Sequence, residues 1–312
     1  MRLLITGAGG FLGSHLTDAA LKHWRGEIVA LCNYHGSWNV GDCPIHERVK
    51  IERLDIRDTQ AVANLSPDLI INAAARISVP YSNQMPTEYA DTNAAAVQRL
   101  LASLPRARFI QISTSEVFNG RNPPYFPDAE VSPATPYGAS KAAAEMYVRA
   151  AGQTIVRCFN LFGPRQTPRA VIPRMALAAW RYKRGETDKV RELYGPHNAE
   201  GVAYSRAFIY APDVADLILR KAVDDPRPLI QLSCGSPYKI AALWSNICAV
   251  VGIDPIDSIE WQPLPDNATA VWRLYGVSTE GYKPRDLDQQ TLAETVEWYG
   301  ANAAKYPKGR YD

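Results

Sequence analysis

The sequence predicts an α/β protein in which a doubly wound parallel sheet carries a smaller C-terminal lobe. Short apolar runs that read as buried strands alternate with segments of helical spacing over residues 1–160. A glycine-rich turn at residues 7–13 separates the first strand from the first helix. After residue 160 the alternation loosens, and prolines and arginines become frequent. These three observations together favour one nucleotide-binding sheet completed by a second, smaller unit.

The composition excludes several classes of function. The chain has 312 residues, 46% hydrophobic residues and a net charge of +2. It can bury a large core, and its charge gives no reason to expect a nucleic acid or a membrane surface as partner. We expect no targeting signal, because the apolar residues at the start run directly into glycines. The cysteines show neither Cys-x-x-Cys nor metal-ligand spacing, so we predict no metal site and a reducing, cytoplasmic setting. They are Cys32, Cys43, Cys158, Cys234 and Cys248.

The first strand and the turn after it predict a dinucleotide cofactor. Residues 2–6 read as a buried strand, and residues 14–23 have helical spacing. Glycines between them allow a tight turn and let N–H groups at the helix start face a pyrophosphate. The alternative is that the glycines form an ordinary tight turn. Because the glycine turn directly follows a strand, we favour cofactor binding by a Rossmann-type unit. The predicted binding residues here are Gly7, Gly10, Phe11, Leu12 and Gly13.

The end of the second strand, at residues 27–32, bears on the choice of cofactor. An acidic residue often stands there to bind the adenosine ribose of NAD, but this chain has Cys32 and Asn33. No Arg or Lys lies between Glu27 and Glu47 to receive a 2′-phosphate. We therefore predict NAD, with Asn33 at its ribose, and leave NADP open.

The third and fourth strands are predicted at residues 49–54 and 69–72. Ala73 and Ala74 follow the fourth strand, and such small residues let a cofactor approach the backbone. Close packing of the chain on itself is the alternative explanation. Asp55 or Asp58, after the third strand, could cap a helix.

Polar side chains gather after the fifth strand, predicted at residues 108–112. Residues 77–81 read as a loop, and residues 86–104 as a helix that precedes this strand. Active sites of doubly wound sheets lie beyond the carboxyl ends of the strands. Thr114, Ser115 and Glu116 stand at that position and are predicted to be catalytic.

The next predicted helix, residues 134–151, carries a tyrosine followed four residues later by a lysine. Tyr137 and Lys141 therefore share one helix face. An ammonium beside a phenol stabilises the phenolate and lowers the pKa of the tyrosine. A surface pair is the alternative, but the cofactor turn and the polar strand end before it favour catalysis.

The remaining elements define the predicted domains. Strands are expected at 154–160, 206–210 and 229–233, and helices up to about 182 and at 212–223, 238–251 and 287–299. We predict an NAD(P)-binding domain at 1–160, completed by about 207–233. Residues 161–206 and 234–312 are predicted to form the substrate-binding lobe.

The whole chain resembles the extended short-chain dehydrogenases/reductases, in the branch of nucleotide-sugar 4,6-dehydratases and epimerases. The glycine spacing is that of this superfamily, and four further local motifs carry the likeness. They are Thr114-Ser115-Glu116-Val117-Phe118, Tyr137-x-x-x-Lys141, the run from Asn160-Leu161-Phe162-Gly163-Pro164-Arg165 to Arg169-Ala170-Val171-Ile172-Pro173, and Arg206-Ala207-Phe208 with Asp213-Val214-Ala215.

The resemblance implies a substrate and a set of contacts. The substrate is a nucleotide-diphosphate sugar, and Asp55 and Ile56 match an adenine-contacting pair. Arg206 matches a phosphate-binding arginine and Asn160 a substrate-contacting asparagine, although Asn160 could equally cap its loop. Arginine binds pyrophosphate bidentately, which makes Arg169 and Arg273 further candidates; surface ion pairs explain those two as well.

Glu116 decides between the reactions of this branch. Tyr137 can take a hydroxyl proton at C4 while hydride leaves, and Glu116 is placed to remove the C5 hydrogen so that water departs from C6. An epimerase has no need of that base, and simple 4-epimerases usually carry small residues there. Many dTDP-glucose dehydratases have Asp at the position of Ser115, whereas GDP-mannose dehydratases have serine there, as this chain does. UDP-glucuronate decarboxylases share Thr-Ser-Glu, but their segment after Gly-Pro-Arg differs from this chain.

We therefore expect an NDP-hexose 4,6-dehydratase. A 4-epimerase or a decarboxylase is the alternative, and a non-catalytic NAD(P)-binding regulatory protein is a remote third possibility. The resemblance also implies a homodimer that packs the helices at 86–104 and 137–151 into a four-helix bundle.

Overall fold

The computed structural model describes residues 1–33, 46–191, 193–195, 204–263 and 273–306. Cys43, for which a free thiol is expected, lies outside the described residues.

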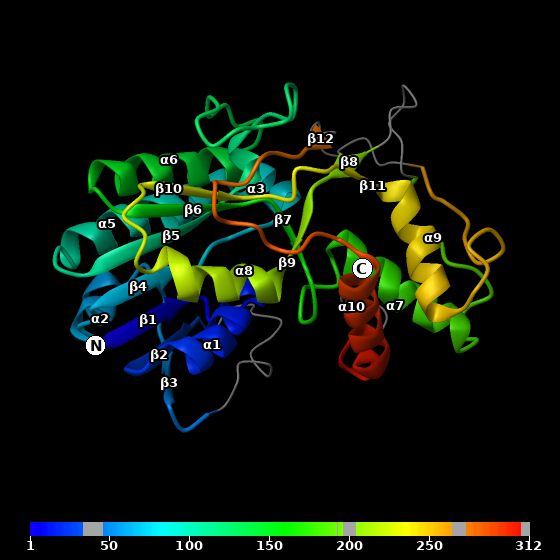
Figure 1. Ribbon diagram of the computed structural model, residues 1–312, viewed down its shortest axis with the longest axis horizontal. Helices are drawn as coiled ribbons and strands as arrows, with labels where there is room; N and C mark the ends of the chain where they lie inside the picture. Colours follow the sequence, from blue (N-terminus) through cyan, green and yellow to red (C-terminus); the bar gives the residue numbers. More distant parts are fainter. Residues whose placement is uncertain (34–45, 192, 196–203, 264–272, 307–312) are drawn as a thin grey trace.

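A parallel sheet in the order β10-β6-β5-β4-β1-β2-β3 forms the centre of the molecule (Figure 1). The order reverses beside β1, so the chain winds first to one edge and then to the other. This arrangement confirms the predicted doubly wound α/β fold. The strands are β1 (Arg2–Thr6), β2 (Glu27–Cys32), β3 (Val49–Arg53), β4 (Leu69–Asn72), β5 (Arg108–Thr114), β6 (Thr154–Cys158) and β10 (Leu229–Leu232).

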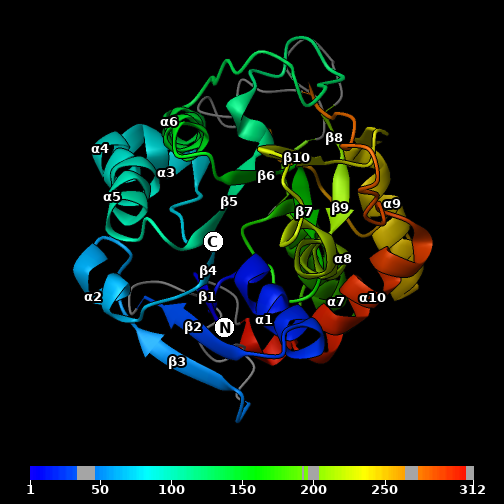
Figure 2. The same cartoon turned by 60° about the vertical axis from the view of Figure 1, so that its left-hand side comes forward.

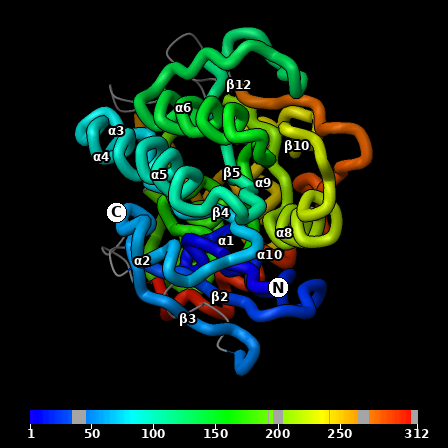
Figure 3. The backbone as a smooth tube through the Cα atoms, turned by 90° about the vertical axis from the view of Figure 1, so that its left-hand side faces the viewer, coloured from blue at the N-terminus to red at the C-terminus, as the bar shows by residue number. Residues whose placement is uncertain are grey.

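Helices cover both faces of the sheet because both faces of its strands are apolar. Leu3 and Ile5 belong to the core under α1 (Phe11–His23) and α8 (Ala211–Leu217), whereas Leu4 belongs to the opposite core. That opposite core lies under α2 (Thr59–Asn64), α5 (Ala96–Ser103) and α6 (Pro136–Ala150). Figures 2 and 3 show α5 and α6 together on one side of the sheet, with α1 on the other.

The segment between β4 and β5 differs from its prediction. The predicted loop at residues 77–81 is wrong in part, because α3 (Val79–Gln84) begins within it. Pro80 lies in the first turn of α3, where a missing N–H costs no hydrogen bond. The helix predicted at 86–104 consists of α4 (Pro86–Ala90), a π-helical turn at Asp91–Ala95 and α5.

The second unit packs α7 (Val171–Lys183), α9 (Ile240–Val251) and α10 (Gln289–Ala301) around one apolar cluster. Figure 1 shows these helices beside the end of the sheet. The domain boundaries drawn from the sequence stay predictions. Within the described residues, no helix is long and apolar enough to span a membrane.

Two strands that the sequence predicts as continuous are each divided into two strands in the structure. The strand predicted at 206–210 splits into β8 (Ser205–Arg206) and β9 (Phe208–Tyr210), which pair in different sheets. β8 lies between β11 (Tyr238–Lys239) and β12 (Arg273–Leu274), so the helix predicted from residue 238 begins only at Ile240. Similarly, the strand predicted at 154–160 ends at Cys158, and β7 (Asn160–Phe162) pairs with β9.

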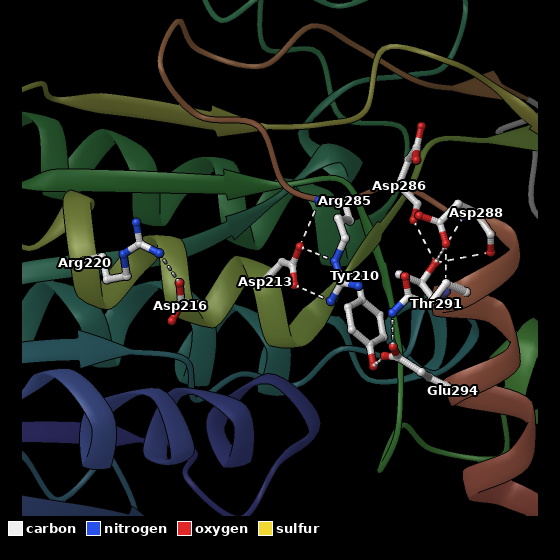
Figure 4. A network of polar contacts seen from close by, with 10 residues as sticks. Tyr210, Asp213, Asp216, Arg220, Arg285, Asp286, Asp288, Thr291 and Glu294 are labelled. Carbon is white, nitrogen blue, oxygen red and sulfur yellow. Dashed lines mark hydrogen bonds and ion pairs between the residues drawn. The ribbon is translucent and has the colours of Figure 1, made fainter.

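A polar network fastens β9 and α8 to the start of α10 (Figure 4). The Tyr210 hydroxyl donates to Glu294 Oε2 over 2.7 Å. The Arg285 guanidinium donates to both Asp213 oxygens over 2.9 Å and lies 4.9 Å from the centre of the Tyr210 ring. Asp288 caps α10 by accepting from the Thr291 N–H over 2.7 Å. These contacts hold the C-terminal helix against the sheet.

Candidate active site

The glycine turn is closed tightly onto the sheet. Gly7 has φ +65°, and a Cβ built there would lie 2.8 Å from the Ala74 backbone. A Cβ on Gly13 would lie 2.0 Å from the Gly7 carbonyl oxygen. Gly10 provides no side-chain cap, so the first N–H groups of α1 (Phe11 and Leu12 among them) are left for another acceptor. The turn therefore requires glycine at these points and presents an uncapped helix start.

Residues after β2 and β3 meet beside this turn. Asn33 Nδ2 donates to Asp55 Oδ2 over 2.9 Å, and Ile56 is buried. Asp55 also accepts from the Arg57 side chain over 2.8 and 3.0 Å, which lowers the pKa of its carboxyl. Asp58, rather than Asp55, caps α2 by accepting from the Ala61 N–H. The backbone of Ala73 and Ala74 packs directly against Gly7. The close packing of the chain on itself, given as the alternative explanation for these two small residues, is therefore present.

The end of β5 and the start of α6 lie in contact. Thr114 Oγ1 accepts from the Glu116 N–H over 3.2 Å, and Ser115 is buried. A Cβ on Gly138 would lie 2.1 Å from the Glu116 carbonyl oxygen, so the first turn of α6 rests on this segment. Thr135 and Pro136 begin α6, and the Thr135 hydroxyl accepts from the Gly138 N–H over 3.1 Å. The structure thus brings Glu116 and Tyr137 together.

Glu116 is a half-buried residue whose carboxylate has one buried, unsatisfied oxygen. Its Oε2 is buried and has no hydrogen-bond partner among the described residues. Burial raises the pKa of Glu116, and the positive charge of Arg206 opposes that shift. Burial in turn lowers the pKa of Arg206, with Glu116 and Tyr204 opposing it. An unsatisfied carboxylate beside an arginine is a group available to a ligand.

Tyr137 lies beside these groups and is 8% exposed. Burial raises its pKa, and a hydrogen bond with Thr114 acts in the opposite direction. The Tyr89 ring packs edge-on against it at 6.3 Å between centroids. Tyr137 is therefore a neutral phenol in the protein without ligand.

The pKa of Tyr137 is raised by burial, whereas the sequence predicts that Lys141 lowers it. The Lys141 Nζ donates to the Ile112 carbonyl oxygen over 2.6 Å, within β5. Burial lowers the pKa of Lys141 to about 8, opposed by Glu145 and Cys158. The two side chains share a helix face as predicted, but the ammonium is engaged by the strand.

A chain of buried amides and hydroxyls connects that strand to the glycine turn. The Ile112 carbonyl also accepts from Gln111 Nε2 over 2.7 Å, and Gln111 Oε1 accepts from Asn72 Nδ2 over 2.8 Å. Thr6 Oγ1 donates to Asn72 Oδ1 over 2.5 Å and accepts from the Ala74 N–H. The carboxyl ends of β1, β4 and β5 are thereby held in one register beneath the site.

Two further buried residues fix the site and were not identified from the sequence. Asn93, on the π-helical turn, donates to the Arg76 carbonyl and to Ser140 Oγ, each over 2.9 Å, and so joins the loop after β4 to α6. The sequence feature that could have identified Asn93 is its position as a polar residue on an otherwise apolar helix face.

His15, on α1, is the second. Its Nε2–H donates to the Pro164 carbonyl over 3.0 Å, and its Nδ1 accepts from Arg165 over 2.5 Å. Burial, assisted by the Arg165 charge, lowers the pKa of His15 to about 3. The neutral ring therefore ties α1 to the loop after β7.

The arginines and the asparagine predicted to bind substrate occupy three places. Arg206 and Arg273 lie on the adjacent strands β8 and β12, where Leu274 pairs with Arg206. Asn160 Nδ2 donates weakly to the Ala207 carbonyl over 3.4 Å. The exposed Arg169 lies over the Tyr81 ring, 5.4 Å from its centre.

Comparison with known proteins identifies the family. The model of the NAD dependent epimerase/dehydratase family matches residues 3–228. The chain belongs to this family. The family is NAD dependent, which confirms NAD as the predicted cofactor, and the uncapped glycine turn closed on Ala73 and Ala74 fits it.

Two relatives match nearly the whole chain. A dTDP-glucose 4,6-dehydratase of Mycolicibacterium smegmatis is 27% identical over 97% of this chain and 94% of that protein. The low-salt glycan biosynthesis protein Agl12 of Haloferax volcanii is 34% identical over 96% of this chain and 98% of its own length.

Solved structures show the same fold. A dTDP-glucose 4,6-dehydratase from Streptomyces venezuelae, with NAD and TYD bound, has a TM-score of 0.83 at 24% identity, covering 97% of this chain and 98% of the other. A UDP-glucose 4-epimerase from Thermotoga maritima, with UDP-glucose, has a TM-score of 0.80 at 23% identity, covering 97% and 100%. These structures show the fold; the family model and the relatives show that the chain is an enzyme of the NAD-dependent sugar dehydratase and epimerase type.

Proposed function

We propose that this protein is an NDP-hexose 4,6-dehydratase that gives an NDP-4-keto-6-deoxy sugar. The observation that carries the proposal is the buried Oε2 atom of the Glu116 carboxylate, which has no partner among the described residues and adjoins Tyr137 and Arg206. A reaction that only oxidises and re-reduces C4 needs no such base. Elimination of water across C5 and C6 does need one.

Each residue has a role in this proposal. NAD, when bound on the α1 turn, supplies the acceptor and donor of hydride. Tyr137 reacts as its phenolate, which receives the C4 hydroxyl proton, and the hydrogen bond with Thr114 favours that phenolate against the effect of burial. Lys141 contributes positive charge beside the reacting centre, and Arg206 with Arg273 binds the pyrophosphate.

Glu116 removes the C5 proton in this scheme. Burial raises the pKa of Glu116, which makes the ionised group a stronger base. The protonated group is still far more acidic than a serine hydroxyl, so it can return the proton to the departing C6 hydroxyl. Ser115 cannot serve as that acid, because a serine hydroxyl is too weakly acidic. We therefore propose that Glu116 both takes the proton from C5 and delivers it to the leaving oxygen.

The alternative is a 4-epimerase or a decarboxylase, and epimerases occur among the relatives: a UDP-glucose 4-epimerase of Mycolicibacterium smegmatis is 30% identical over 70% of this chain. Incubation with UDP-, GDP-, dTDP- and CDP-sugars, followed by mass measurement of the products, separates the three. Loss of water with no net consumption of NAD supports the dehydratase. An unchanged mass, or loss of carbon dioxide, with every sugar would rule out the dehydratase proposal.

We also propose a homodimer and a reducing, cytoplasmic setting. Met146 and Tyr147 on α6 are 57% and 45% exposed, and an apolar patch on that helix supports packing against a second copy. The described cysteines form no disulfide, which supports the reducing setting. Light scattering of the wild type and of Met146→Lys tests the dimer, which the substitution is expected to weaken.

A further inference from the structure

A buried ion pair lies beneath the candidate site. Glu145 on α6 and Arg157 on β6 are 2% and 1% exposed. Arg157 Nε donates to Glu145 Oε1 over 3.1 Å, and its Nη2 donates to Oε2 over 2.7 Å. Burying two charges is costly unless their hydrogen bonds are complete, so the pair calls for an explanation beyond packing.

Neighbouring strands complete those hydrogen bonds. Ser113 Oγ, on β5, donates to Glu145 Oε1 over 2.5 Å. Arg157 Nη1 donates to Gln231 Oε1, on β10, over 3.3 Å. The Glu145 carboxylate therefore accepts three hydrogen bonds, one from Ser113 and two from Arg157, which leave it little freedom to turn.

Glu145 lies one helical turn after Lys141 on α6, so the two side chains share a face. They are anchored to consecutive residues of the same strand. Lys141 Nζ donates to the Ile112 carbonyl over 2.6 Å, and Glu145 accepts from Ser113. Any rotation of α6 that displaces one of these anchors displaces the other.

We infer that Glu145 is a positioning residue for Lys141, whose ammonium it keeps charged and directed at the end of β5. Ser113 and Arg157 serve this role by fixing the carboxylate. The consequence for catalysis rests on the proposed function, because a neutral Lys141 would give no charge to the reacting centre.

Among the described residues that face Lys141, no anion other than Glu145 can keep its ammonium charged. Burial lowers the pKa of Lys141 to about 8, opposed by Glu145 and Cys158. Burial also raises the pKa of Cys158 to about 12, so this thiol, on β6, is uncharged at neutral pH. Tyr137, one turn earlier on α6, has a raised pKa and is neutral as well. Arg157, the remaining charged neighbour, is a cation bound through Glu145.

The titration of Lys141 tests this inference without reference to turnover. The protein is labelled with ¹³C-lysine, and the Lys141 signal is assigned by its loss in Lys141→Met. Lys141 is the one lysine that is buried among the described residues, so its signal is expected to titrate apart from the others. The titration is recorded in wild type, Glu145→Gln and Glu145→Asp, and in the double variant Glu145→Gln/Arg157→Met, which leaves no unpaired buried guanidinium.

The inference predicts that the midpoint falls by about one pH unit in Glu145→Gln. It predicts a smaller fall in the double variant and a midpoint within about 0.3 unit of wild type in Glu145→Asp. If Glu145→Gln does not fold, the double variant decides. A folded variant without the carboxylate whose Lys141 midpoint equals or exceeds that of wild type overturns the inference. Failure of the dehydratase proposal would appear in product masses and would leave this titration unaffected.

Discussion

The glycine turn offers a quantitative prediction at Gly13. A Cβ added there would lie 2.0 Å from the Gly7 carbonyl oxygen, 2.7 Å from its carbon and 2.8 Å from Ala8 Cα. All three atoms belong to the backbone, so no side chain can move aside. Carbon and oxygen need roughly 3 Å or more, and Gly13→Ala must therefore displace the turn from α1 by about 1 Å.

That displacement has two expected costs. Overpacking of a rigid backbone lowers the free energy of unfolding by about 1–3 kcal/mol. A shift of about 1 Å also removes one or more hydrogen bonds between the start of α1 and the pyrophosphate, at about 1.5–3 kcal/mol for each bond to a charged group. The dissociation constant for NAD should then rise by at least about tenfold.

Isothermal titration calorimetry with NAD, together with urea unfolding, measures both effects. Gly152→Ala is the matched control, because Gly152 has φ +65° but a Cβ added there would meet no atom within 4 Å. It should lose about 1 kcal/mol of stability through backbone strain alone and bind NAD as wild type does. Wild-type NAD affinity in Gly13→Ala would refute the assignment of this turn to the cofactor.

Two further predictions concern pH. His15 has a folded-state pKa of about 3 against an ordinary value of 6.5, so the unfolded chain binds the extra proton and stability falls as pH drops from 6.5 toward 3. His15→Gln should flatten that loss by up to about 1.4 kcal/mol per pH unit in urea unfolding; an unchanged slope would contradict it. Arg206→Met should raise the pKa of Glu116 and move the acid limb of the kcat profile to higher pH, because Arg206 opposes the effect of burial. Arg273→Met is the control: it should raise KM without moving that limb, and equal shifts in both variants would count against the Glu116–Arg206 coupling.

Much of the fold follows from local sequence. The bounds of β1, β2 and β4 agree with the predictions because each is a short apolar run buried on both faces and ended by a polar or glycine residue. The clustering of Thr114, Glu116 and Tyr137 follows from one strand end and one helix start. The strand bounds need only neighbouring residues, and the clustering needs only the rule that active sites lie beyond the carboxyl ends of parallel strands.

Other features depend on contacts between distant segments. A glutamate in a helix usually lies in solvent, and only the register of α6 on β5 and β6 buries Glu145 against Arg157. His15 meets Arg165 across 150 positions of sequence. The pKa of Tyr137 is raised rather than lowered for the same reason, because tertiary packing buries the phenol.

The most direct test of the proposed elimination uses an NDP-hexose carrying deuterium at C4, chosen from the sugars that the wild type converts. The wild type is expected to give a product lighter by one water that retains the deuterium. Glu116→Gln is expected to bind the sugar and form reduced nicotinamide, seen by its absorbance, yet to release no dehydrated product. Dehydration by Glu116→Gln at the wild-type rate would contradict the central claim that this carboxylate removes the C5 proton.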